Sequence, residues 1–251
     1  MVIMKINYCI EKNIELKEVY KLLGDIGTEL KQILIKEGAS LVGFGDISEL
    51  VKGQNDNMKC GISVVVRMTP NIVKDIQNGP SEEYYFEYKR LNLLLDHLVI
   101  VGATFLKEKG FKALAQTTIS VKEFGNYRTL FPHKSFATRS GIGWIGKCAL
   151  LVTEEYGSAI RISSILTNAP LVVSKPINHA KCGSCMVCVN ACPSGAASGQ
   201  EWDLVKDRDE FFNPVLCRKQ ARVRAKKIGI EETICGKCIQ ICPYTQRYIN
   251  R

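Results

Sequence analysis

Cysteines near the C-terminal end constrain most strongly what this chain of 251 residues can fold into. Eight of its 11 cysteines lie between Cys182 and Cys242. The first four have the spacing C-x2-C-x2-C-x3-C, at positions Cys182, Cys185, Cys188 and Cys192, and Pro193 follows. Two-residue spacers let three successive thiolates wrap one 4Fe–4S cube, while the fourth cysteine ligates the other cluster of a pair. This run predicts iron–sulfur binding.

A second run completes the ligand count. Cys235, Cys238 and Cys242 form C-x2-C-x3-C before Pro243, and Cys217 can supply the missing thiolate from upstream. Eight thiolates suffice for two 4Fe–4S clusters, and the crossover rule assigns them. We expect the first cluster on Cys182, Cys185, Cys188 and Cys242, and the second on Cys192, Cys217, Cys235 and Cys238.

Two other uses of clustered cysteines fit less well. Zinc sites favour two C-x2-C pairs or mixed Cys/His tetrads, and His179, the one nearby histidine, is more typical of a surface or cap position. A disulfide framework needs a secreted context. Glu11, Lys12 and Glu15 interrupt any signal-like apolar core near the start of the chain. The longest apolar stretch, 98–106, is too short to span a bilayer. We therefore expect a cytoplasmic protein with no membrane segment.

The formal net charge of +9 suggests an anionic partner. Residues 218–227 concentrate six of the basic side chains directly after Cys217. As a helix they can contact tRNA phosphates or an acidic redox partner. A solvated face that offsets the negative charge of the clusters explains the run equally well, and both interpretations stay open.

The periodicity of the remaining chain predicts an α+β domain over residues 1–177 and a cysteine module over 178–251. Apolar residues at helical spacing favour a helix over 14–37, and Ser81 can cap a long helix that ends at Gly110. A short helix is expected over 134–141. Runs of strand length and β-branched composition are expected as strands at 41–47, 60–68, 148–153 and 159–166.

A glycine-rich motif, GIGWIGK, occupies residues 141–147. Its glycines let the backbone approach a ligand closely, and Lys147 offers a cation to an anionic group. The spacing matches neither a phosphate-binding P-loop nor a dinucleotide fingerprint. From these residues alone a structural turn and a ligand loop are equally good interpretations.

Together, GIGWIGK, the segment 157–171 and the two cysteine runs resemble epoxyqueuosine reductases. That family is cobalamin-dependent and related to the reductive dehalogenases. The resemblance implies a nitroreductase-related cobalamin-type domain followed by a bacterial ferredoxin-like two-cluster module. It implies base-off cobalamin that receives electrons from the clusters, with reduced ferredoxin or flavodoxin as donor and a small molecule or modified nucleoside as substrate. The corrinoid-pocket residues it implies are Gly141, Gly143, Trp144, Gly146 and Lys147. Arg139, just before the motif, is a further cofactor-binding candidate, since its guanidinium can meet a phosphate or propionamide, although a helix-surface position is also typical of arginine.

Two departures from the family pattern shape the expected chemistry. The family's aspartate, the proposed proton donor, has no counterpart here because residues 127–139 contain no carboxylate. His133 and Tyr127 are the candidate replacements, since both side chains can donate a proton. The family's C-terminal helical-repeat domain, which helps to grip tRNA, has no counterpart in the 251 residues either, so we expect a short form.

The sequence thus predicts an iron–sulfur oxidoreductase whose clusters reduce a bound cobalamin that acts on an organic substrate. The alternative is an electron carrier or corrinoid-reactivating protein without substrate chemistry of its own. Three cysteines, Cys9, Cys60 and Cys148, lie outside the ligand set and are expected to be buried or incidental. Cys148 directly follows the glycine-rich motif and is the one that can contact the cofactor.

Overall fold

A computed structural model of the protein describes residues 16–55 and 57–251. Its centre is a four-stranded antiparallel sheet in the order β1-β2-β8-β3, formed by Leu41–Asp46, Cys60–Arg67, Ile160–Thr167 and Ala113–Ala115. Strand β2 pairs with β1 on one side and with β8 on the other. The predicted strands at 41–47, 60–68 and 159–166 are therefore confirmed, and the fold is a mixture of helices and strands.

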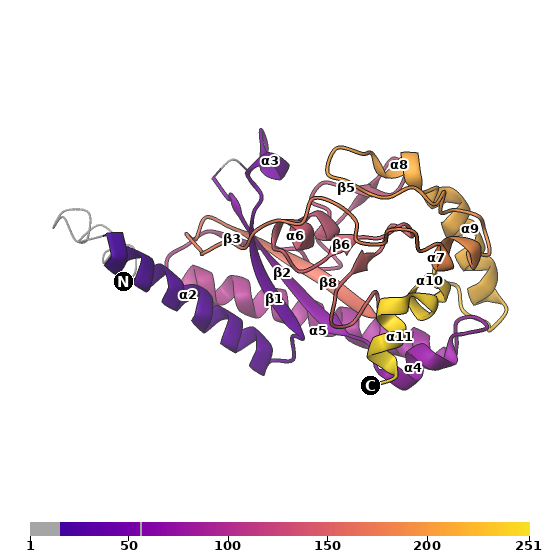
Figure 1. Ribbon diagram of the computed structural model, residues 1–251. Coiled ribbons are helices and arrows are strands. Elements are labelled where there is room, and N and C mark those ends of the chain that lie inside the picture. Colours follow the sequence, from indigo (N-terminus) through magenta and orange to yellow (C-terminus); the bar gives the residue numbers. More distant parts are fainter. Residues whose placement is uncertain (1–15, 56) are drawn as a thin grey trace.

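Two long helices cover one face of this sheet (Figure 1). They are α2, Leu16–Lys36, and α5, Glu82–Glu108. Ser81 caps α5 by accepting a hydrogen bond from the peptide N–H of Tyr84 at 3.2 Å, as predicted. Between the helices and the sheet lies the main core, which includes Leu30, Leu98 and the β2 residues Ile62 and Val64. Alternation along β2 turns every second side chain toward these helices.

The other residues of β2 face α6, His133–Arg139. Val65 packs with Ala137, and a Cβ at Gly61 would come within 2.8 Å of the Phe136 ring. Because both faces of β2 are covered, the strand is buried from Cys60 to Val66. The β-branched run in the sequence predicts this double burial.

One predicted strand is much shorter than expected. Within 148–153, only Leu151–Val152 form strand β7, and it pairs with β6, Trp144–Ile145. The residues before β7 turn instead, with Ala149 at φ +58° and its peptide N–H bonded to the Gly146 carbonyl. The expectation of a strand over 148–150 was wrong because this local turn takes its backbone hydrogen bonds.

Short elements complete the chain. Helix α3, Ser48–Val51, follows β1, and helix α4, Pro70–Asp75, follows β2 and contacts α5, α10 and α11. A small hairpin follows α5, with strands β4, Glu123–Phe124, and β5, Arg128–Thr129. The C-terminal region carries five helices: α7, Val187–Asn190; α8, Arg208–Phe211; α9, Pro214–Lys226; α10, Lys237–Ile241; and α11, Pro243–Ile249.

The C-terminal region is anchored to the sheet at its end. Tyr248 of α11 donates a hydrogen bond to the Met68 carbonyl at 2.7 Å, and the Ser158 peptide N–H donates to Oγ1 of Thr245 at 3.0 Å. A Cβ at Gly157 would come within 2.2 Å of the Thr245 nitrogen, so the backbones touch there. Residues 178–251 and the sheet thus share buried contacts.

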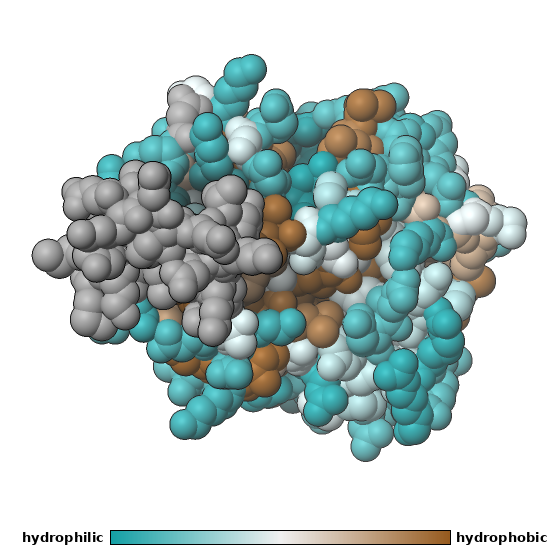
Figure 2. All heavy atoms as spheres, turned by 60° about the vertical axis from the view of Figure 1, so that its left-hand side comes forward, coloured by the Kyte–Doolittle hydropathy of each residue, from teal (hydrophilic) through white to brown (hydrophobic). Residues whose placement is uncertain are grey.

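The surface is mostly polar. Figure 2 shows hydrophobic atoms gathered in a band on one face, with hydrophilic residues over most of the rest of that view. Large exposed hydrophobic side chains include Phe86, Leu93 and Ile100 of α5. Over the described residues, no helix combines the length and apolarity needed to cross a membrane.

Candidate cluster and cofactor site

Two neighbourhoods of described cysteines can be distinguished in the C-terminal region, although Cys192 of the second also raises the pKa of Cys188 in the first. Cys182 and Cys188 lie close enough to Cys242 to raise its pKa, after the larger effect of burial. Cys192 and Cys235 act in the same way on Cys217, whose pKa burial raises to about 11. All ten described cysteines are free thiols, and Cys9 lies outside the described residues. These neighbourhoods contain members of the two predicted ligand sets, which remain a prediction.

The surroundings of Cys192 suit a thiolate. Burial raises its pKa, but the Ser194 hydroxyl and the peptide N–H groups of Ser194, Ala196 and Ala197 outweigh burial, and the pKa lies below its ordinary value. Peptide donors aimed at a sulfur stabilise its anionic, metal-binding form. Within the described residues, no three His, Cys, Asp or Glu side chains converge to hold a single metal ion. A cube does not require such convergence, since its ligands surround a larger inorganic core.

The glycine-rich motif lies against the first cysteine loop. Lys147 donates a hydrogen bond from Nζ to the Gly183 carbonyl at 2.7 Å. A Cβ at Gly146 would stand 3.6 Å from Sγ of Cys182, while one at Gly143 would come within 2.3 Å of the Val152 carbonyl oxygen. Close packing therefore requires glycine at 143, and a Cβ at Gly146 would also come within 3.0 Å of Cγ2 of Val152. Gly141 has φ +68°.

Cys148 lies between the two cysteine neighbourhoods. It is buried, and its pKa is well above the ordinary value. The Cys188 thiol opposes this rise, whereas the Cys238 thiol and burial cause it. Cys60 is buried elsewhere, on β2, where burial raises its pKa to about 12. Of the three extra cysteines, the sequence singled out Cys148, and the structure places it against predicted cluster ligands.

A large cavity, of about 1220 Å³, opens beside the cysteine region. Two parts of the chain form its walls. One part contributes Asp46 at the end of β1, residues of α6 and residues 160–162 of β8. The other part contributes Trp202, Asp207 and Ile239. Binding sites for drug-sized ligands occupy roughly 300–1,000 Å³, so this cavity can take a larger molecule.

The predicted site residues divide between these two places. Tyr127, His133 and Arg139 line the cavity. Of the glycine-rich motif, Ile145 lines it, whereas the predicted corrinoid-pocket residues Gly141, Gly143, Trp144, Gly146 and Lys147 are not among the described lining residues. The structure thus brings the proton-donor candidates to the cavity and most of the motif to the cysteines.

His133 is held in an uncharged state. Its Nδ1 lies 2.7 Å from the Ser164 hydroxyl oxygen. Burial, with a smaller effect from the charge of Arg161, lowers the pKa of its imidazole to about 4. A neutral imidazole is a weak acid, so this environment does not support the predicted role of His133 as proton donor. Tyr127 is exposed, with the Arg218 guanidinium 4.4 Å from its ring centre.

Two cavity residues escaped the sequence analysis. Lys134 donates from Nζ to the Ala149 carbonyl at 2.6 Å, and burial lowers the pKa of its ammonium to about 8. Asp46 accepts hydrogen bonds from the side chain and peptide N–H of Ser48, which hold the pKa of its carboxyl below the ordinary value. In the sequence, Lys134 simply follows a histidine and Asp46 lies at the end of a strand. Neither pattern indicates that the two residues line one cavity.

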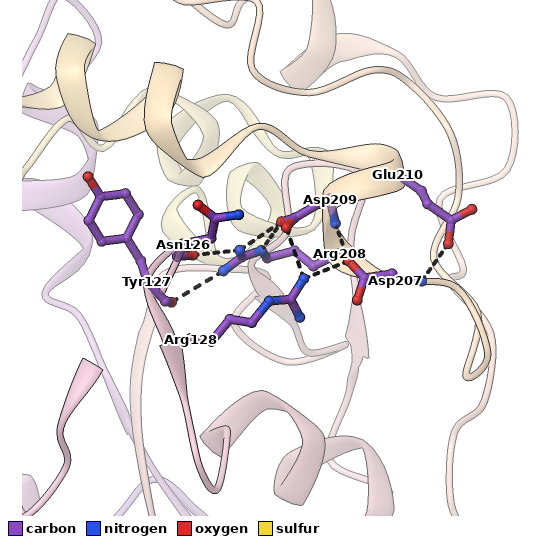
Figure 3. Close-up of polar contacts among 7 residues, drawn as sticks. All are labelled: Asn126, Tyr127, Arg128, Asp207, Arg208, Asp209 and Glu210. Atoms are coloured by element: carbon purple, nitrogen blue, oxygen red, sulfur yellow. Dashed lines mark hydrogen bonds and ion pairs between the residues drawn. The ribbon is translucent and has the colours of Figure 1, made fainter. Parts of the chain in front are cut away.

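An ion-pair network joins the β4–β5 hairpin to α8 at the edge of this cavity (Figure 3). The Arg128 guanidinium lies 2.7 Å from an Asp207 carboxylate oxygen and 2.9 Å from one of Asp209. Arg208 donates to the carbonyls of Asn126 and Tyr127 at 2.6 and 3.2 Å. The hairpin is thereby fastened to the cysteine region.

Comparison with known proteins confirms the predicted resemblance. Residues 181–245 match the family described as "4Fe-4S double cluster binding domain". The chain is 33% identical over 120 residues to an epoxyqueuosine reductase of Listeria monocytogenes, covering 44% of this chain and 28% of the relative. It is 34% identical over 145 residues to the Bacillus subtilis reductase, covering 55% and 34%. The matches thus span about a third of each curated relative.

Solved structures share the fold. A reductive dehalogenase in complex with 3-bromo-4-hydroxybenzoic acid aligns with TM-score 0.67 at 15% identity, over 86% of this chain and 31% of that one. An epoxyqueuosine reductase with a modified tRNA stem loop aligns with TM-score 0.57 at 19% identity, over 88% and 66%. At these identities the likeness concerns the fold alone. The chain therefore carries a 4Fe–4S double cluster binding domain within a fold shared with reductive dehalogenases, and it resembles the epoxyqueuosine reductases.

Proposed function

We propose that this protein is an iron–sulfur oxidoreductase in which two 4Fe–4S clusters pass electrons to a cobalamin bound in the cavity, which reduces an organic substrate. Residues 1–177 would form the nitroreductase-related cobalamin domain and residues 178–251 the ferredoxin-like module. The free thiols that the clusters need suit a reducing compartment, the cytoplasm.

The cavity is the observation that carries this proposal. Ile239, next to the predicted ligand Cys238, is part of its wall, which would put the proposed second cluster beside the cavity. Its volume of about 1220 Å³ suits a ligand larger than a drug-sized molecule. One structural neighbour is described as a structure that "suggests a mechanism for B12-dependent dehalogenation", which supports a corrinoid as that ligand.

Arg139 offers a direct test of fit. It lines the cavity and donates to the Ile177 carbonyl at 3.1 Å, while its Nε is buried without a hydrogen-bond partner among the described residues. A buried donor is destabilising until it finds an acceptor, and the amide oxygens around a corrinoid ring are acceptors. Bound there, cobalamin would supply a low-valent cobalt as nucleophile or reductant. The protein's own part is to orient the substrate, exclude water and supply a proton.

Lys134 is the cavity group best suited to supply that proton. Its pKa of about 8 keeps it protonated at neutral pH and still able to release the proton there. The carboxyls of Asp46 and Asp207, by contrast, are held ionised by their hydrogen-bond donors, which lower their pKa values. Tyr127 at the cavity rim is the second candidate.

The proposed substrate is a small epoxide or a modified nucleoside, and reduced ferredoxin or flavodoxin is the proposed donor. A structural neighbour holds an epoxyqueuosine-modified tRNA stem loop, which makes that RNA the first substrate to try. Filter binding at two salt concentrations tests it, because phosphate contacts weaken steeply with salt. Equal retention at both concentrations would argue for a small molecule.

One observation favours the alternative of an electron carrier or corrinoid-reactivating protein. Near neutral pH, neither the imidazole of His133 nor the carboxyl groups of Asp46 and Asp207 carry a proton that they could donate readily. In that case the loaded protein would reduce added cob(II)alamin but turn over no epoxide, with Lys134 serving only to position a ligand.

The deciding experiment is anaerobic purification, cluster reconstitution and titration with cob(II)alamin, followed by EPR. A base-off cobalt signal that disappears on reduction is the expected result. The variant Ser135→Trp, which places a large ring on the α6 wall of the cavity, should weaken cobalamin binding at least tenfold at unchanged iron content. Only free, base-on cobalamin beside intact clusters would refute the proposal.

A further inference from the structure

The glycine-rich motif presents its polar groups to the first cysteine loop. The Lys147 ammonium donates a hydrogen bond to the carbonyl of Gly183, the residue after Cys182, at 2.7 Å. A Cβ at Gly146 would lie 3.6 Å from Sγ of Cys182, which is van der Waals contact, so this part of the motif lies directly against that sulfur. The motif therefore forms a cradle around this loop.

Trp144 is the most deeply buried member of this cradle. Its side chain has no exposed surface, and its ring meets that of Tyr244 edge-on with centroids 4.8 Å apart. Tyr244 follows two residues after Cys242, so the indole is fixed between both ends of the first predicted ligand set. A ring packed in this way cannot reorient to find a new partner.

The indole N–H of Trp144 is a donor in need of an acceptor. Nε1 is fully buried and has no hydrogen-bond partner among the described residues. The sulfur of Cys182 is the acceptor that we assign to this N–H. Cys182 packs against the apolar cluster that contains Trp144, and its sulfur lies beside Gly146, two residues further along the motif. A thiol is a weak acceptor, whereas a cluster-bound thiolate is a strong one.

We propose that Trp144 is a positioning residue of the first cluster, whose indole N–H donates a hydrogen bond to the Cys182 sulfur and raises the reduction potential of that cluster. Hydrogen bonds to cluster sulfurs stabilise the more negative, reduced state and are a main determinant of the potential. The inference rests on the proposed ligation by Cys182 but requires no cobalamin.

The test uses Trp144→Phe in the full-length, reconstituted protein without corrinoid. Phenylalanine keeps an aromatic ring in the core but lacks the N–H. We expect full iron and sulfide content, a more negative midpoint potential for one cluster in an EPR-monitored titration, and no change for the other. Trp202→Phe is the matched control, because Trp202 belongs to the same apolar cluster. It should shift neither potential.

A second measurement leaves Trp144 in place. The chain has only two tryptophans, so Trp202→Phe labelled with indole-15N carries a single label, at Trp144. Pulsed EPR of its reduced clusters should show one coupled 15N nucleus. Absence of this coupling, or unchanged potentials in a fully loaded Trp144→Phe, would overturn the inference. Altered cobalamin binding with unchanged potentials would equally overturn it and return Trp144 to the corrinoid pocket.

Discussion

At the scale of single residues, the environment decides which ionisable groups of the cavity can work. His133 and Lys134 are neighbours in sequence, yet burial lowers the pKa of one to about 4 and of the other to about 8. Near neutral pH the histidine is uncharged and the lysine is charged. Burial disfavours the charged form of both side chains, and only their different ordinary pKa values separate their roles.

The lowered pKa of His133 predicts acid sensitivity of the fold. Between pH 6.5 and 4 the imidazole of His133 binds a proton in the unfolded state but not in the folded state. The free energy of unfolding therefore decreases as the pH falls through this window. From pH 7.5 to 6.0 the loss from this group is about 0.8 kcal/mol. His133→Gln should remove that loss in anaerobic urea unfolding, whereas the exposed control His179→Gln should keep it. Identical pH dependence in both variants would contradict the prediction.

Lys134 predicts a basic limit to turnover. Its ammonium is present below about pH 8 and is lost as the pH rises through that value, so the rate with the proposed substrate should fall on the alkaline side. Lys134→Met should lower the rate by roughly 10²–10⁴ at neutral pH and abolish this alkaline decline. Lys206→Met, at another lysine of the cavity wall, is the control. A retained alkaline decline in Lys134→Met would assign the proton to another group.

At the scale of elements, the β4–β5 hairpin forms the rim of the site and helix α9 forms its outer face. The β4–β5 hairpin is held by Arg128 to Asp207 and Asp209, and by Arg218 of α9 to Glu123 at 2.9 Å. Isolated surface ion pairs contribute little to stability, but a network in which Arg128 bridges two carboxylates contributes more. The hairpin therefore stays closed over the cavity edge through charges rather than through a core.

A double-mutant cycle on Arg128→Ala and Asp207→Ala should show this coupling. We expect an interaction free energy of about 0.5–1 kcal/mol in urea unfolding at low salt, decreasing in 1 M salt as the charges are screened. The exposed pair Lys181 and Glu154, 2.6 Å apart, is the matched control and should couple more weakly. Equal coupling in the two cycles would show that the network adds nothing.

Helix α9 carries the predicted ligand Cys217 and exposes a mixed basic and apolar face. Within the described chain, exposed Lys219 and Arg222 form no ion pair, and Val215 and Val223 are exposed beside them. Unpaired cations next to apolar groups suit an acidic protein donor. Helix α9 lies at the right edge of Figure 1, away from α2.

Charge reversal tests this face. The pair Lys219→Glu and Arg222→Glu should slow cluster reduction by an acidic ferredoxin or flavodoxin at least tenfold at low salt, with the difference shrinking at high salt. Reduction by dithionite should be unchanged. Lys31→Glu with Lys36→Glu on α2 is the matched control. An effect on dithionite equal to that on the protein donor would point to cluster damage instead.

At the scale of the whole molecule, the described residues form one large apolar core and three smaller apolar clusters. The large core lies between the sheet and helices α2 and α5, reaches Ala225 and Ile234 of the C-terminal region, and contains no predicted ligand. The smaller cluster around Trp144, Trp202 and Phe211 includes Cys242. Metal binding contributes directly to the folding of a region whose ligands are scattered along the chain. Iron should therefore matter far more to residues 181–245 than to the sheet.

Removal of iron by a chelator under mild oxidation predicts a split response. Hydrogen exchange should become fast over 181–245, while β2, β8 and α5 keep their protection. Reconstitution with iron and sulfide should restore the slow exchange. Loss of protection across the whole chain would instead show that the sheet depends on the clusters.

Features that depend on local spacing could be predicted from the sequence alone. The two cysteine runs, the cap at Ser81 and the buried β2 run were all predictable, because thiolate spacing, helix capping and apolar periodicity involve residues close together in the chain. The turn at Ala149 was missed because the hydrogen bonds that its backbone forms do not depend on the type of residue.

Which residues come together depends on the packing of the whole chain. Asp46, His133, Arg161 and Asp207 line one cavity although Asp46 and Asp207 are 161 residues apart, and no local pattern marks such a meeting. The orientation of GIGWIGK toward the cysteines rather than into the cavity was likewise undetermined. A glycine-rich segment indicates that another group lies close to its backbone. Whether that group is a ligand or another part of the protein depends on how the whole chain packs.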